Sequence, residues 1–184
     1  MISIRETPIA GVKIVQSDAV QDERGAFSRL FCANEMETVI AGRKIVQINQ
    51  SVTRRQGAIR GMHFQHAPHA EMKIVRCLRG RVLDVAVDLR RGSPTLLKWT
   101  ACELSPAERL AFVIPEGCAH GFQVLEPDSE LLYLHTAFYT RESEGGVRFD
   151  DPRVAIEWPL APADLSQRDR SHPLLPPDFT GIAS

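Results

Sequence analysis

Four short segments of this 184-residue chain carry side chains that can transfer protons or bind anions. They are residues 57–65, 114–122, 131–139 and 165–169. In the first segment, Arg60 and His63 stand among glycines, which allow a ligand to approach the backbone closely. Arginine also presents a planar fork that suits phosphate. The alternative for this segment is a turn with a surface arginine and a packed histidine.

The histidines of the first two segments raise the question of a metal site. Nitrogen and oxygen ligands for iron, manganese or zinc are offered by five residues, namely His63, His66, His69, Glu71 and His120. The pattern Pro115-x-Gly117-x-x-His120 is similar to the second motif of cupin jelly rolls. Residues three apart on a strand face opposite sides, so His63 and His66 cannot both point into a barrel without an intervening turn. We therefore expect no metal, and a metal-dependent cupin isomerase or dioxygenase remains an alternative that elemental analysis would detect.

The other two segments place aromatic and acidic side chains on a strand and near a helix. The only tyrosines of the sequence, Tyr133 and Tyr139, share one face of a predicted strand with His135, because side chains two apart point the same way. The commoner place for such tyrosines is the core, with the hydroxyl hydrogen-bonded. Asp169 ends the last segment, where it either lies on the surface or folds back over the barrel to orient a histidine.

Strands are expected to position these groups, because apolar runs and short turns alternate over most of the chain. The clearest hairpin joins residues 73–78 to residues 81–89 through Arg79-Gly80. Further strands are predicted at residues 1–4, 12–16, 26–32, 44–51, 96–104, 110–114, 121–125 and 131–139, with short helices at 34–41 and 163–168. Many short strands at fairly even spacing predict an all-β, cupin-type jelly-roll barrel with short C-terminal helices.

The second arm of that hairpin has two chemically different faces. Leucines and valines from Leu83 to Leu89 lie on one face, while Asp84 and Asp88 lie on the other. The ordinary place for such aspartates is solvent, and a pocket is the alternative for Asp84.

The composition excludes several classes of function. The formal net charge is -1, from 22 basic and 23 acidic residues, so the chain has no general basic field for nucleic acid. No run approaches the ~20 apolar residues of a membrane span, and the N-terminus lacks the apolar core of a signal peptide. Four cysteines without a CxxC pair indicate reduced, buried thiols and a cytoplasmic location. We expect neither a nucleic-acid partner nor a membrane.

Segments spread from Arg24 to Pro173 resemble, in their order and spacing, the dTDP-4-dehydrorhamnose 3,5-epimerase family. They are residues 24–27, 47–51, 60–65, 73–76, 84–90, 93–95, 115–122, 133, 150–152, 156–159 and 165–169. The resemblance implies a single jelly-roll epimerase domain over residues 1–184, with N-terminal strands and a dimer arm in 1–50, the core barrel in 51–140 and a C-terminal segment in 141–184. It also implies a homodimer whose N-terminal segment reaches the neighbouring subunit, and catalysis with no metal and no nicotinamide cofactor.

The reaction implied by the resemblance is epimerisation at C3 and C5 of dTDP-4-dehydro-6-deoxy-D-glucose, through an enolate, to dTDP-4-dehydro-L-rhamnose. His63 is then expected to be the base, since imidazole titrates near neutrality, and Asp169 is expected to fix its tautomer. Lys73 is expected to stabilise the enolate oxygen. Tyr133 is expected to donate a proton on the opposite face.

A second set of residues is expected, by the same resemblance, to bind the nucleotide-sugar substrate. Its members are Arg24, Phe27, Gln47, Asn49, Arg60, His120, Asp84, Tyr139 and Arg168. Within it, Arg60, Gln47 and Asn49 are expected to bind the diphosphate. Arg24 and Phe27 are expected to clasp the nucleotide across the dimer, and His120 and Asp84 to line the pocket and support Lys73.

Three positions depart from the family pattern. Arg29 stands where the family usually has an acidic residue, Glu71 replaces a frequent glutamine, and Cys118 replaces a bulky aromatic residue. Because Arg29 reverses a local charge, two related activities stay open: an epimerase of a GDP- or CDP-linked 4-keto sugar, and an enzyme that inverts only C3 or only C5. A non-catalytic sugar-binding jelly roll is disfavoured, because a binder needs neither a base nor a proton donor.

Overall fold

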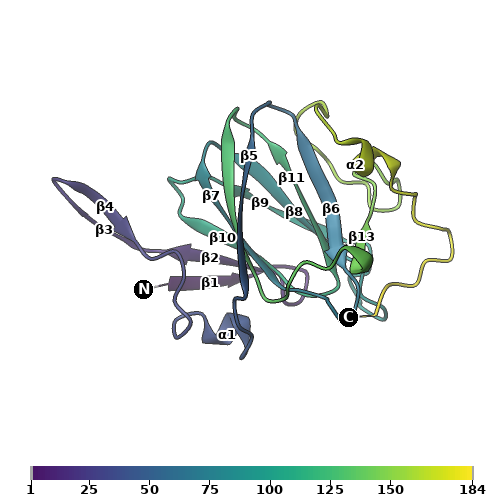
Figure 1. Ribbon diagram of the computed structural model, residues 1–184, viewed down its shortest axis with the longest axis horizontal. Helices are drawn as coiled ribbons and strands as arrows, with labels where there is room; N and C mark the ends of the chain where they lie inside the picture. The colour runs from purple at the N-terminus through teal and green to yellow at the C-terminus, as the bar shows by residue number, and fades with distance from the viewer. Residues whose placement is uncertain (1, 184) are drawn as a thin grey trace.

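Two antiparallel β-sheets face one another in the computed structural model, which describes residues 2–183 (Figure 1). The six-stranded sheet has the order β1 (Ile2–Glu6), β2 (Lys13–Ser17), β10 (Leu110–Ile114), β7 (Lys73–Arg79), β12 (Ser129–His135) and β5 (Gln47–Thr53). The five-stranded sheet has the order β13 (Glu144–Gly146), β6 (Ile59–Gln65), β11 (Cys118–Val124), β8 (Val82–Asp88) and β9 (Trp99–Leu104). The all-β jelly roll that the sequence predicts is confirmed. In the strand predicted at residues 1–4, Met1 lies outside the described residues.

An apolar core fills the space between the two sheets. Val75 and Phe112 of the six-stranded sheet and Leu104 of the five-stranded sheet are fully buried in it. The inward face of β8 also carries Asp84 and Asp88, and both side chains are 0% exposed. Solvent, the ordinary place for such aspartates, is therefore wrong for both side chains, and the alternative of a buried position holds for Asp84.

The outer faces of the sheets are covered as well, which explains the burial of β8. Helix α1 (Glu37–Ile40) packs Val39 near Ile74 on the six-stranded sheet. The C-terminal segment packs Trp158 over Val85 on the five-stranded sheet. Since the apolar face of β8 lies under this segment, its polar face must point between the sheets.

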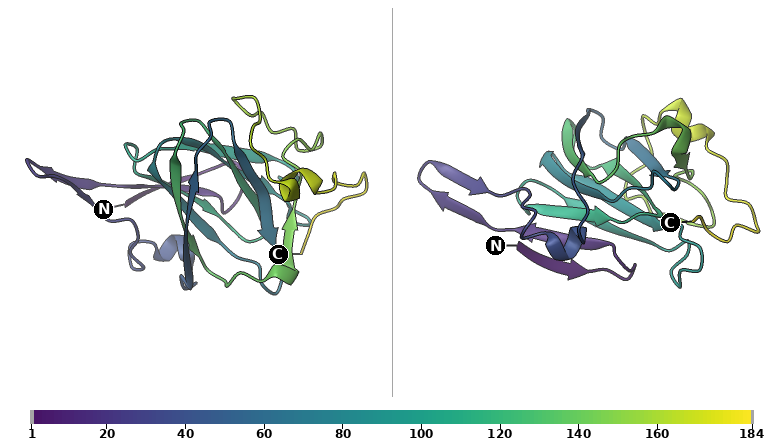
Figure 2. Two further views of the ribbon diagram at one scale, coloured as in Figure 1. Left: turned by 45° about the horizontal axis from the view of Figure 1, so that its top comes forward. Right: turned by 60° about the horizontal axis from the view of Figure 1, so that its bottom comes forward.

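The strands β3 (Ala19–Asp22) and β4 (Gly25–Ser28) form a hairpin that pairs with neither large sheet. It projects from one end of the barrel in all the ribbon views (Figures 1 and 2). Val20 and Phe27 are each 74% exposed on it, so its apolar side chains have no cover within the chain.

The C-terminal segment runs along the outer face of the five-stranded sheet and comes back to the barrel next to β6 (Figure 1). Isolated bridges join Ala163 to Ala58 and Ile182 to Arg90. A short 3₁₀ helix, η1 (Arg141–Ser143), precedes β13. These contacts hold an otherwise irregular segment in place over the sheet.

Helix α2 (Gln167–Ser171) begins later than the helix predicted at residues 163–168. The side-chain oxygen of Ser166 accepts a hydrogen bond of 3.0 Å from the backbone N–H of Asp169. This N-cap satisfies one of the free donors of the first turn and fixes where the helix starts. Among the described residues, no helix is long and apolar enough to cross a membrane.

Candidate active site

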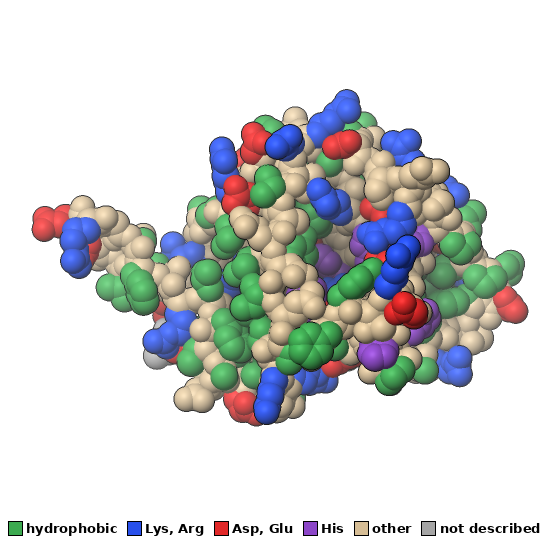
Figure 3. All heavy atoms as spheres, in the orientation of Figure 1, with side chains coloured by type: hydrophobic (Ala, Val, Ile, Leu, Met, Phe, Trp, Pro, Cys, Tyr) green, Lys and Arg blue, Asp and Glu red, His purple; other side chains and the backbone are tan. Residues whose placement is uncertain are grey.

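A cavity of about 540 Å³ opens between the sheets and under the C-terminal segment. Histidine side chains lie in this hollow, with basic side chains around its rim (Figure 3). The predicted site residues that line it are Asn49, Arg60, His63, Lys73, His120, Tyr133, Arg168 and Asp169. The structure thus brings most of the predicted set together.

The remaining predicted residues lie in three other places. Gln47 and Tyr139 line an adjoining cavity of about 280 Å³ that shares His63 and Lys73 with the first. Asp84 lies behind His120 and is fully buried. Arg24 and Phe27 are on the projecting hairpin β3–β4, and neither lines a cavity around His63. Their expected contact with a nucleotide therefore needs a second subunit.

A bulge in β6 lets Arg60 and His63 point to the same cavity although they are three residues apart. His63 pairs with His120 and Arg60 pairs with Phe122, so three steps on β6 match two on β11. Such a bulge re-aims side chains that would otherwise face opposite sides. Gly61, with φ of 134°, lies in the bulge, where an added Cβ would come within 2.5 Å of the Gly121 Cα. Glycine is required there because the two backbones nearly touch.

His66 follows the strand and has no such bulge before it. Its ring packs edge-on against Phe64, with centroids 4.9 Å apart, and it does not line the cavity. Among residues 2–183, the group of histidines and acids whose ligand atoms come within 4.8 Å of one another is His63, Asp169 and His172. The five-residue metal set considered from the sequence is therefore not brought together.

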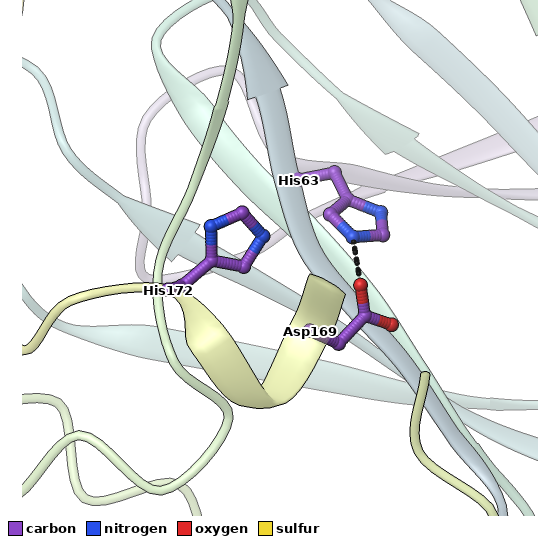
Figure 4. A group of neighbouring side chains, drawn as sticks. All are labelled: His63, Asp169 and His172. Carbon is purple, nitrogen blue, oxygen red and sulfur yellow. Dashed lines mark hydrogen bonds and ion pairs between the residues drawn. The ribbon is translucent and has the colours of Figure 1, made fainter. Parts of the chain in front are cut away.

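His63 and Asp169 form the central pair of the cavity. His63 Nε2 lies 2.8 Å from Asp169 Oδ1 (Figure 4). Burial raises the pKa of Asp169, but the hydrogen bond and charge of His63 and the hydrogen bonds from Gly61 and Ser166 lower it to about 2. An ionised carboxylate only accepts hydrogen bonds, so Nε2 carries the proton and donates. The lone pair of Nδ1 is then free to act as a base.

Arg168 places a third charge beside this pair. Its Nη1 donates to Glu144 Oε1 at 2.9 Å and its Nε to Asp169 Oδ1 at 3.4 Å. Its Nη2 lies 3.1 Å from His63 Nε2. Since Nε2 already carries a proton, that last contact joins two donors and is not a hydrogen bond. The Arg168 side chain is 53% exposed, so solvent screens much of its charge.

His172 is a neighbour of the pair that the sequence reasoning missed. Its ring centroid lies 5.9 Å from that of His63, and its Nε2 is buried without a hydrogen-bond partner. Burial, then the charge of His63, lower its pKa. The available signal was its spacing, because residues three apart at a helix end lie on one side, as Asp169 and His172 do.

A second histidine–acid pair lies behind the cavity. His120 Nε2 and Asp84 Oδ1 share a hydrogen bond of 2.6 Å. Burial raises the pKa of Asp84, against the lowering effects of His120 and Lys73. Its Oδ2 atom has no hydrogen-bond partner, so this acid is less well satisfied than Asp169.

A third pair joins Glu71, which the sequence offered only as a possible metal ligand, to His135, to which the sequence assigned no role. His135 Nδ1 lies 2.7 Å from Glu71 Oε2, and Lys73 Nζ lies 3.3 Å from Glu71 Oε1. Burial raises the pKa of Glu71, but His135 and Lys73 outweigh it and the pKa is lowered. The ionised acid therefore accepts from Nδ1, and His135 Nε2 accepts from the Asn49 amide at 3.2 Å. Lys73 thus has a counter-ion at the cavity wall.

Tyr133 enters the cavity from the opposite sheet to His63. It lies on β12, while His63 lies on β6. Its hydroxyl is 3.1 Å from Ser51 Oγ, and its ring stacks on His135 with centroids 6.1 Å apart. Burial raises the pKa of the phenol, so Tyr133 holds its proton at neutral pH. The cavity thus has the His63–Asp169 pair on one wall and a protonated phenol on the other.

The fold and this cavity define a jelly-roll protein with a polar cavity in which histidine–acid pairs, a tyrosine and basic side chains meet. The family model described as dTDP-4-dehydrorhamnose 3,5-epimerase matches residues 6–176. This chain belongs to that family, as its sequence segments indicated.

Individual relatives are similar to this chain over nearly its whole length. The dTDP-4-dehydrorhamnose 3,5-epimerase of Sinorhizobium fredii is 42% identical over 91% of this chain and 86% of its own. The dTDP-4-dehydrorhamnose 3-epimerase of Streptomyces niveus is 38% identical over 94% of this chain and 83% of its own. The crystal structure of dTDP-6-deoxy-D-glucose-3,5-epimerase from Legionella pneumophila in complex with dTDP-4-keto-L-rhamnose superposes with a TM-score of 0.89 at 38% identity, covering 94% of this chain and 92% of that one.

Proposed function

We propose that this protein is an isomerase that inverts C3 and C5 of dTDP-4-dehydro-6-deoxy-D-glucose and forms dTDP-4-dehydro-L-rhamnose. The observation that carries the proposal is the placement of the His63–Asp169 pair and Tyr133 on opposite walls of one cavity. Inversion at carbon requires a proton to leave one face and another to arrive at the opposite face. Two walls with a base and an acid meet that requirement.

The chemistry uses the acidity of C–H bonds next to the 4-keto group. His63 Nδ1 takes the proton, and the electron pair of the C–H bond moves to the keto oxygen as an enolate. Lys73, which lines the cavity, stabilises this negative charge with its ammonium group. The Tyr133 hydroxyl then gives its proton to the carbon from the other face. Each inversion leaves a protonated His63 and an ionised Tyr133, which return to their starting states by exchange with water.

Substrate binding is assigned to the polar wall and rim of the same cavity. Arg60 and Asn49 line it and offer donors for a diphosphate, while Gln47 and Tyr139 line the adjoining cavity. The Legionella pneumophila relative in complex with dTDP-4-keto-L-rhamnose supports a dTDP sugar as the ligand. Base, acid and positive charge all come from side chains, so the proposed reaction needs no cofactor.

A homodimer would bring the projecting hairpin to a neighbouring subunit. The exposed Phe27 and Val20 support this assembly, because apolar side chains of that size are usually covered. Arg24 and Phe27 would then reach the nucleotide of the partner. Sedimentation equilibrium tests the assembly, and a monomer at micromolar concentration contradicts it.

The free cysteines support a cytoplasmic location.

The second candidate function is epimerisation at C3 alone. The observation that favours it is the 38% identity to the dTDP-4-dehydrorhamnose 3-epimerase of Streptomyces niveus. Both carbons flank the same keto group, so the same base and acid serve either outcome.

Hydrogen exchange in deuterium oxide tests the proposal and separates the two candidates. The metal-stripped protein is incubated with dTDP-4-dehydro-6-deoxy-D-glucose, and C3 and C5 are followed by NMR and mass spectrometry. Deuterium at both carbons, with the product formed, supports the 3,5-epimerase. Deuterium at C3 alone supports the 3-epimerase. No exchange by the folded protein contradicts both.

A further inference from the structure

The space beside the His63–Asp169 pair has the composition of a metal site. His63, Asp169 and His172 each offer one ligand atom, and these atoms lie within 4.8 Å of one another. Figure 4 shows the His172 ring beside His63, with the Asp169 carboxylate below His63. Two imidazoles and one carboxylate are a ligand set that zinc, cobalt and iron accept, with further positions left for water.

The residues around His172 leave a space of the right shape for its imidazole ring beside His63. An added Cβ at Gly146 would lie 2.3 Å from the His172 ring, so glycine makes room for the ring beside His63. Gly146 pairs with His63 in the β13–β6 ladder, which places this room next to the base. The buried Nε2 of His172 has no hydrogen-bond partner, and burying such an atom costs free energy unless something binds it.

Arg168 opposes a cation at this place. Its Nη2 lies 3.1 Å from His63 Nε2, so its charge repels an incoming metal ion. The side chain is half-exposed, and turning it into solvent would break only its ion pair with Glu144 and its long 3.4 Å contact with Asp169. Arg168 should therefore weaken metal binding without preventing it.

We propose that His63, Asp169 and His172 form an inhibitory site for a divalent transition-metal ion of the zinc type. The proton of the neutral His63 ring moves from Nε2 to Nδ1, and the freed Nε2 lone pair binds the ion together with one oxygen of Asp169 and one nitrogen of His172. The ion replaces the proton that Asp169 accepts in the free protein. A neutral imidazole that binds a cation through Nε2 carries its proton on Nδ1 and has no lone pair there to act as a base, so the inference is that the bound ion slows proton abstraction. The binding part stands alone, while the inhibition part rests on the proposed function.

Binding is tested with cobalt alone, in the absence of any substrate. Titration of the metal-stripped protein with Co²⁺, followed by its visible absorption and by calorimetry, should show one ion per chain. His172→Gln should weaken the site at least about tenfold, since it removes one of three ligands. Arg168→Gln should tighten the site, because it removes the opposing charge. His66→Asn is the matched control, because this nearby histidine lies outside the cavity, and it should leave Co²⁺ affinity unchanged.

The outcomes separate this inference from the proposed function. Absence of Co²⁺ binding, equal affinity in His172→Gln, or loss of binding in His66→Asn would each overturn the site. Zn²⁺ should also slow deuterium exchange in the unchanged protein and should do so about tenfold less effectively in His172→Gln. If the protein shows no exchange at all, the proposed function fails, and the Co²⁺ titration still decides whether the site exists.

Discussion

Asp84 and Asp88 lie four residues apart on the same inward face of β8, and both are fully buried, yet their surroundings differ. Asp88 accepts hydrogen bonds from the backbone and guanidinium of Arg90 and from the hydroxyls of Ser93 and Thr95. Asp84 has His120 as its hydrogen-bond partner, and its Oδ2 atom has none.

The pKa values follow this difference. Burial raises the pKa of Asp88, but its hydrogen bonds lower it to about 2. Burial raises the pKa of Asp84 and is not outweighed. A fully satisfied carboxylate stabilises the loop after β8, whereas an incompletely satisfied one lies behind the cavity. The comparison teaches that burial alone does not set the protonation preference of an acid, because the number of donors around each carboxylate decides whether burial is outweighed.

The largest effect is expected at His63, the proposed general base on the reactive side of this comparison. His63→Asn removes the base, and deuterium incorporation at C3 and C5 should become about 10³-fold slower, which is about 4 kcal/mol. The free energy of unfolding in urea should fall by about 1–2 kcal/mol, because the buried Asp169 carboxylate loses a hydrogen-bond partner, and this is too little to unfold the protein. His66→Asn is the control and should keep its rate. A His63→Asn protein with an unchanged rate would show that another group is the base.

The next effect is expected on stability, in the loop after β8. Asp88→Asn keeps the shape but removes the charge that Arg90, Ser93 and Thr95 surround, so the protein should unfold about 3 kcal/mol more easily in urea. Asp84→Asn is the matched control at the other end of the same face. Burial already disfavours the charge of Asp84, so the neutral amide should cost less than about 1 kcal/mol. Equal losses in the two variants would break the comparison.

The sequence predicted how side chains alternate between the two faces of β8, but it did not predict what covers each face. Period two correctly put Asp84 and Asp88 on one face. That this face points between the sheets depends on the C-terminal segment, which covers the apolar face from some 70 residues further along the chain. Contacts at that separation leave no local pattern, so period two alone could not tell whether this face is buried or exposed to solvent.

The candidate site, like the fold, could be predicted from the sequence only in part. The residues His63, Lys73, Tyr133 and Asp169 were chosen through a family resemblance, and the structure places all four around one cavity. The bulge that turns Arg60 and His63 the same way contradicts the simple spacing rule, because it depends on the contact of two glycine backbones. His172 and His135 were missed, and Glu71 was considered only as a metal ligand, since each acquires its place from a partner elsewhere in the chain. The expected roles of Arg24 and Phe27 remain predictions.

A smaller effect is expected at low pH, where Asp88 should lose its contribution to the free energy of unfolding. A carboxyl whose pKa is lower in the folded than in the unfolded chain stabilises the fold above its ordinary pKa, 3.8 for Asp88, and this stabilisation is lost as the pH falls toward 2. The expected loss between pH 5 and pH 2 is about 2 kcal/mol for Asp88. Urea unfolding across this range measures it, and the Asp88→Asn curve should be flatter by that amount. An equally steep curve in Asp88→Asn would place the titrating group elsewhere.

The smallest effect is expected at Glu71, whose carboxylate faces Lys73 at 3.3 Å and His135 at 2.7 Å. Glu71→Gln keeps the side-chain shape and removes the counter-ion of Lys73, so the ammonium should act more strongly on the enolate oxygen. Deuterium exchange should become about 3-fold faster, a change below about 1 kcal/mol, because the surroundings are polar and partly screened. Glu130→Gln is the control, since this acid pairs with the exposed Gln50 on the edge of the sheet and should leave the rate unchanged. Slower exchange in Glu71→Gln would mean that the carboxylate serves mainly to position Lys73, and that an acid beside a catalytic cation can matter more for geometry than for charge.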